Sequence, residues 1–60
     1  MTRYNVTFIL DTCVVTTTVE FDGARTGPQI VVYAADCINN DLQLDFDVLD
    51  AALDTIVEEL

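Results

Sequence analysis

Two segments near the N-terminus alternate apolar and polar residues, and this pattern constrains the fold more than any other feature. From Tyr4 to Leu10 every second side chain is apolar, with Asn5 and Thr7 between the first three. From Val14 to Phe21 valine, threonine and phenylalanine repeat the alternation. Because successive side chains of a strand point to opposite faces, both segments predict strands with one buried face. The intervening Asp11-Thr12-Cys13 break is short enough for a hairpin turn, which predicts an antiparallel pair.

The middle of the chain has two interpretations. Ile30–Ala35 is an unbroken apolar run, and such a run is compatible with a buried strand. The apolar residues that instead follow the helical spacing i, i+3, i+4 and i+7 are Val31, Ala34, Ala35, Ile38 and Leu42. Gly27-Pro28 also offers a helix start, since proline is well tolerated at the first helical position. We therefore expect a helix from Pro28 to about Leu42.

The C-terminal third also has two interpretations. Leu42, Leu44 and Phe46 alternate with polar residues and predict a short extended connector that reaches the core. Asp47 is a suitable helix N-cap, with Asp50 favourable to the helix dipole. A helical apolar stripe follows, made of Val48, Leu49, Ala52, Leu53, Ile56, Val57 and Leu60. We favour a helix to the C-terminus over the rival interpretation, a short helix followed by a third strand at Thr55–Leu60.

These elements predict a single α+β domain over residues 1–60, with an N-terminal antiparallel β-hairpin packed on one or two helices. The alternative is a ββββα order, in which residues 30–35 and 42–46 are strands joined by an Asn39-Asn40 turn. The core is predicted to include Val6, Phe8, Val19, Phe21, Ala34, Ile38, Leu49, Leu53 and Ile56.

The charge balance restricts the classes of function. Eleven acidic residues face two basic ones, Arg3 and Arg25, and the net charge is −9. Such a field repels nucleic acid and anionic membranes and attracts basic surfaces. The acidic excess also fits general solubility or adaptation to high salt. No apolar segment approaches the length of about 20 residues that a membrane span needs, and no secretory signal is recognised. We therefore expect a soluble, cytoplasmic protein.

Chemistry-bearing residues are scarce. The chain has no histidine, so it lacks a side chain whose ordinary pKa suits a general base near pH 7. Cys13 and Cys37 are too far apart in the sequence for a CxxC motif. We expect two small buried thiols rather than a disulfide. Residues 41–47 begin like a calcium-binding loop, but Phe46 stands where glycine is needed, and Ala52 where a bidentate glutamate is needed. We predict no enzyme activity, no metal and no cofactor.

The acidic residues of the C-terminal part are the candidate partner-binding site. On the favoured helix, Asp47, Asp50, Asp54 and Glu58 recur at i, i+3, i+7 and i+11. Their axial spacing of about 5–6 Å is of the same order as the phosphate spacing of DNA, which suggests DNA mimicry. A solvated helix face is the simpler interpretation. The full candidate set is Asp41, Asp45, Asp47, Asp50, Asp54, Glu58 and Glu59.

The order of these patterns resembles the small acidic accessory proteins of bacteriophages. The resemblance rests on a hairpin that begins MTRYNVTF, a TxxVEF exit strand, a helix and an acidic tail that ends IVEEL. It implies a non-enzymatic inhibitor or modulator of a host or defence protein that has a basic surface. The alternative is a homodimer or other homo-oligomer, in which apolar residues around Val32 and Tyr33, or the C-terminal stripe, pack on a second copy.

Overall fold

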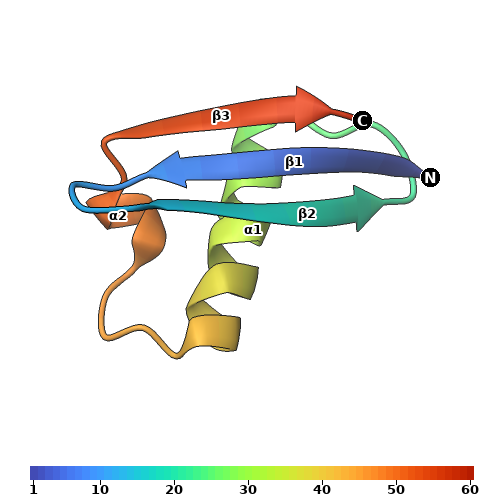
Figure 1. The fold of residues 1–60 in the computed structure, drawn as a ribbon. Coiled ribbons are helices and arrows are strands. Elements are labelled where there is room, and N and C mark those ends of the chain that lie inside the picture. Colours follow the sequence, from blue (N-terminus) through green and yellow to red (C-terminus); the bar gives the residue numbers. More distant parts are fainter.

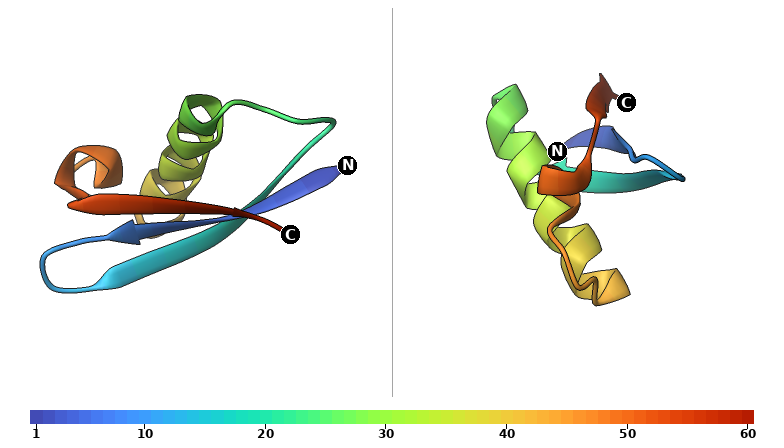
Figure 2. Two further views of the ribbon diagram at one scale, coloured as in Figure 1. Left: turned by 90° about the horizontal axis from the view of Figure 1, so that it is seen from above. Right: turned by 90° about the vertical axis from the view of Figure 1, so that its left-hand side faces the viewer.

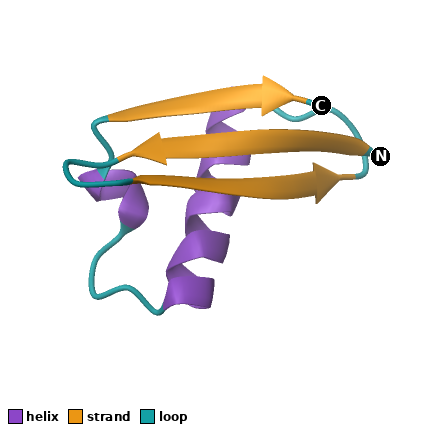
Figure 3. Ribbon diagram, viewed as in Figure 1, coloured by secondary structure: helices purple, strands orange, loops and turns teal.

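The N-terminal hairpin forms as the alternation predicts, and it supplies two of the three strands of the sheet. The computed structural model describes residues 1–60. It contains strands β1 (Thr2–Ile9), β2 (Val14–Phe21) and β3 (Asp54–Glu59) and helices α1 (Gly27–Leu42) and α2 (Val48–Ala51). Both helices lie on the same face of a three-stranded sheet (Figures 1 and 3). The views in Figure 2 show these two layers from above and from the side. The protein is therefore an α+β domain, as predicted.

The sheet has the order β2-β1-β3, and both neighbours of β1 are antiparallel to it. The Leu10 amide donates to the Cys13 carbonyl at 2.8 Å, and the Leu60 amide donates to the Arg3 carbonyl at 2.9 Å. Bonded residues alternate along an antiparallel ladder. Even-numbered residues of β1 therefore bond to β2, and its odd-numbered residues bond to β3. Both outer strands are left with a free edge.

Helix α1 begins where the sequence suggests. Thr26 caps it, because the Gln29 amide donates to the Thr26 hydroxyl and the Thr26 amide donates to the Gln29 side-chain oxygen. This reciprocal pair is a capping box, and Pro28 follows in the first turn. The helix prediction for residues 28–42 is confirmed, and the ββββα alternative is wrong. The helix ends at Gln43, which adopts the left-handed conformation with φ 51°.

The core lies between the sheet and α1. Its buried residues are Tyr4, Val6, Phe8, Val19, Ile30, Ala34, Ala35, Ile38 and Val48. Five of the nine predicted core residues are in this set, and Phe21 and Leu49 are partly buried against it. Leu53 and Ile56 were predicted to be buried, but they are 71% and 50% exposed. In the connector, Leu44 packs on the core, whereas Leu42 and Phe46 are exposed.

The C-terminal helix prediction is wrong, and the rival interpretation is the one that the structure shows. Helix α2 ends at Ala51, and residues 54–59 form β3. A two-stranded hairpin would leave the odd-numbered backbone groups of β1 without partners. Pairing β3 with β1 satisfies these groups, and a second helix could not do so. Ile56 then takes a position opposite Thr7, on the face that no helix covers.

Candidate partner-binding surface

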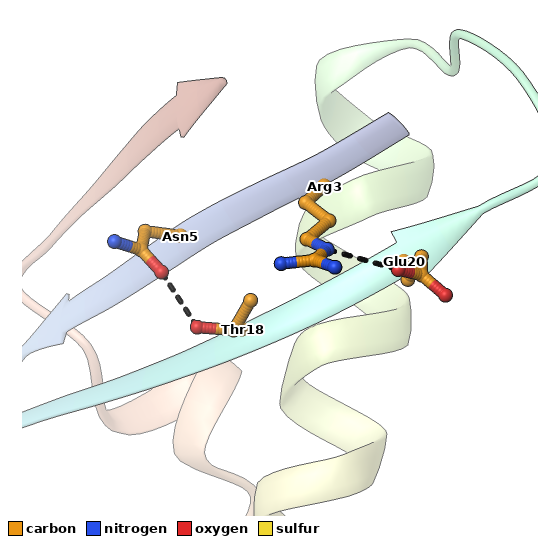
Figure 4. A network of polar contacts seen from close by, with 4 residues as sticks. All are labelled: Arg3, Asn5, Thr18 and Glu20. Carbon is orange, nitrogen blue, oxygen red and sulfur yellow. Dashed lines mark hydrogen bonds and ion pairs between the residues drawn. The ribbon is translucent and has the colours of Figure 1, made fainter. Parts of the chain in front are cut away.

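The face of the sheet that no helix covers is a ladder of polar pairs between β1 and β2. Arg3 donates to Glu20 at 3.0 Å, and Thr18 donates to Asn5 at 2.6 Å (Figure 4). A hydroxyl pair, Thr7 with Thr16, continues the ladder at 3.1 Å. These bonds link directly paired residues, so they hold the register of the hairpin. They also engage one of the two cations of the protein.

The second cation is engaged at the same end of β2, beside the last residue of the strand. The Arg25 guanidinium carbon lies 5.3 Å from the centre of the Phe21 ring, within cation–π range. Phe21 in turn contacts Tyr4 and Tyr33 edge-on, at centroid distances of 6.1 and 5.1 Å. The single ion pair of the structure is Arg3 with Glu20. The seven candidate carboxylates of the C-terminal part therefore have no cationic partner within the chain.

These seven carboxylates lie on three elements and the segments that join them, and they do not share one helix face. The structure places Asp41 in the last turn of α1, Asp45 in the connector and Asp47 at the N-cap of α2. Asp50 lies within α2. On β3, Asp54 and Glu58 pair with Ile9 and Asn5 on the uncovered face of the sheet, whereas Glu59 pairs with Tyr4 on the helix face. All seven are exposed: Asp41, Asp45, Asp47, Asp50, Asp54, Glu58 and Glu59. The helical spacing on which the DNA comparison depended is absent, because the helix stops at Ala51.

Asn39 joins α1 to α2 and so positions the acidic segment. Its side-chain amide donates to Asp47 Oδ1 at 3.0 Å, and its side-chain oxygen accepts from the Val48 amide at 3.0 Å. Its backbone carbonyl accepts from the amides of Gln43 and Leu44 at the end of α1. We call the side-chain bonds of Asn39 to residues 47 and 48 the Asn39 clamp. This role of Asn39 was not predicted from the sequence, where the usable signal was an Asn eight residues before the N-cap Asp47.

Asp47 caps α2 as predicted, since its side chain accepts from the Leu49 amide at 3.0 Å. The hydrogen bond from Asn39, followed by the one from the Leu49 backbone, lowers the pKa of Asp47 below its ordinary value of 3.8. Both donors favour the ionised carboxylate. Asp47 therefore stays negatively charged in the folded protein, and one of its oxygens is already committed to the cap.

A shallow groove of about 610 Å³ runs beside α1. Its lining includes Pro28, Val32, Tyr33 and Asp36 from α1, with Asp47 and Leu49 from the α2 segment. Val32 and Tyr33 are 58% and 49% exposed, as expected for residues that could meet a partner. The groove lining thus combines apolar side chains with two carboxylates.

No group of three or more cysteine, aspartate or glutamate side chains is close enough to hold a metal ion. Neither helix has the length and apolar character that a membrane crossing requires. Cys13 and Cys37 are both free. Cys13 is exposed at the hairpin turn and Cys37 is only partly buried, so neither thiol is fully buried as predicted.

Comparisons with protein-family models, with curated proteins and with solved structures find no match for this chain.

Proposed function

We propose that this protein is a non-enzymatic binding module that docks on a basic surface of another protein. The observation that carries the proposal is the set of exposed carboxylates between residues 41 and 59, none of which has a cation beside it. The two arginines are engaged elsewhere and do not offset this charge. A basic partner would supply the missing countercharge and would be steered to the surface over long range.

The resemblance to phage accessory proteins suggests the kind of partner. We propose a host or defence protein, met in the cytoplasm, whose function is blocked or modulated by the bound module. DNA mimicry is the special case in which the partner's basic groove normally holds nucleic acid. The proposal does not require that case, because the exposed carboxylates lie on several elements rather than in one helical row.

The test compares two matched variants as baits in a bacterial lysate. The first variant neutralises Asp50, Glu58 and Glu59 as Asn or Gln. The control neutralises Asp11, Asp22 and Asp36, which lie outside the candidate set. We expect the wild type and the control to capture the same lysate protein at about 50 mM salt. The first variant should not capture this protein. The affinity of the wild type for it should fall sharply at about 500 mM salt. An affinity that is insensitive to salt, or equal binding by the first variant, would refute electrostatic docking.

Self-association through the groove is the second candidate function, and the exposed Val32 and Tyr33 favour it. In that case the carboxylates keep the assembly in solution. Light scattering after size exclusion at low salt and at about 1 M salt gives the mass directly. A dimer at both salts that Val32→Asp disrupts would support this function, and a monomer at millimolar concentration would refute it.

A further inference from the structure

Strand β3 is an edge strand, and no other strand pairs with the backbone groups along its outer edge. Leu60 bonds to Arg3 of β1, and the paired positions alternate from there, so residues 58, 56 and 54 also face β1. The amide and carbonyl groups of Thr55, Val57 and Glu59 therefore point away from the sheet, where the Thr55 amide donates to the Asp54 carboxylate at 2.8 Å. A free edge of this kind is a template for one more strand.

The same strand exposes apolar side chains on both faces of the sheet. Val57 is 37% exposed on the helix face, and Ile56 is half exposed on the other face. Leu53 and Leu60 flank the strand and are 71% and 61% exposed. Apolar surface at an open edge remains in contact with water unless another strand covers it.

Carboxylates stand beside this apolar surface and indicate the charge of the added strand. Asp54 and Glu58 lie on the uncovered face, and Glu59 lies on the helix face. A second copy of β3 would bring six carboxylates together along one strand pair, and like charges across strands are destabilising. Basic residues opposite these positions would be stabilising for the same reason.

The other free edge, at β2, is less suited to this role. Its acidic residue, Glu20, is already bonded to Arg3. The C-terminal turns of α1 and the segment that follows them extend past β2 on the helix side, whereas no element extends past β3 (Figures 1 and 2). An overhanging helix is one way in which proteins protect a sheet edge.

We propose that β3 accepts an extended segment of the partner as a fourth strand, and that this segment has apolar residues at its centre and basic residues on both sides of them. Its backbone would bond to Thr55, Val57 and Glu59. Its basic side chains would lie opposite Asp54 and Glu58, and its apolar ones opposite Ile56 and Val57. This inference rests on the proposed function and gives the mode by which the basic partner binds.

The experiment uses three synthetic probes and two variants of one residue. The strand probe is the capped peptide Thr-Lys-Lys-Val-Val-Thr-Lys-Thr. A second probe replaces each lysine by threonine. A third keeps the three lysines and replaces all the remaining residues by proline, which prevents strand pairing. Val57→Pro removes an outward amide and leaves the bonds to β1 in place, since proline is tolerated at an edge with its nitrogen facing solvent. Val57→Thr is the matched control, because it keeps the amide and the β-branch.

We expect the strand probe to bind the wild type and Val57→Thr with similar affinity at about 50 mM salt. Binding to Val57→Pro should be about tenfold weaker. On binding, the amide protons of Thr55, Val57 and Glu59 should become protected from exchange in the wild type. The exchange measurement needs no variant, so it tests the mode even if Val57→Pro does not fold.

The outcomes separate the two proposals. Strand addition is overturned if the strand probe and the proline probe bind equally and Val57→Pro has the same affinity as Val57→Thr. Binding through charge would then stand. If the threonine-substituted probe binds as well as the strand probe, the basic partner is overturned while the edge stands. If no probe binds, or the three amides gain no protection, the fourth-strand proposal fails.

Discussion

Replacement of Asn39 by alanine tests whether one side chain holds the acidic segment in place. In the Asn39 clamp, the side-chain oxygen accepts from the partly buried Val48 amide, and the side-chain nitrogen donates to Asp47. Alanine removes both bonds and leaves the Val48 amide without its acceptor. Asn40→Ala is the matched control, because Asn40 is the next residue of α1 and is exposed.

The size of the effect follows from the Val48 bond. A partly buried amide that loses its acceptor costs about 1–2 kcal/mol of unfolding free energy. Alanine also raises helix propensity by roughly 0.5 kcal/mol in either variant, so the comparison with Asn40→Ala cancels this gain. The bond to Asp47 joins exposed groups and adds little. At about 4–8 °C per kcal/mol for a domain of this size, Asn39→Ala should melt roughly 5–15 °C below Asn40→Ala.

Urea denaturation followed by far-ultraviolet circular dichroism measures this difference, with thermal melts as a second reading. We expect a lower midpoint for Asn39→Ala and an unchanged slope, since the unfolded surface is the same. Equal midpoints for the two variants would show that the Asn39 clamp contributes nothing. The position of α2 would then have to depend on the buried Val48 side chain alone.

Two further predictions concern the core and the acid response. Phe8→Ala empties a fully buried site at a cost of about 3–5 kcal/mol, which approaches the whole stability of about 3–9 kcal/mol expected for 60 residues. We expect a largely unfolded circular dichroism spectrum, whereas Val14→Ala, at an exposed position, should keep the fold. The pKa of Asp47 is lowered in the folded state, so its ionised carboxylate stabilises the fold. This stabilisation is complete at pH values above the ordinary pKa of 3.8, and it is lost as the pH falls through the lower pKa of the folded state. The stability difference between wild type and Asp47→Asn, measured by urea titration at several pH values, should therefore shrink as the pH is lowered below 3.8; a difference independent of pH would contradict the assignment.

The sequence alone was sufficient for the elements with strong local patterns. The alternation in β1 and β2 identified their buried faces, and Pro28 with the helical spacing identified α1. Asp47 was recognised as an N-cap because a short acceptor side chain before an apolar run has that local role. In each case neighbouring residues within a few positions determine the conformation.

The C-terminal strand was decided by the tertiary structure. Residues 48–60 carry an apolar stripe that fits a helix, and β-branched residues at 55–57 that fit a strand, so local preference does not choose between them. The choice depends on the odd-numbered backbone groups of β1, about 50 positions away, which need hydrogen-bond partners. That distant pairing turned Leu53 and Ile56 from expected core into exposed residues, and it divided a predicted acidic helix face between a cap, a short helix and a sheet edge. A pattern read along the chain does not contain this information, because the bonds that settle it join segments from opposite ends of the sequence.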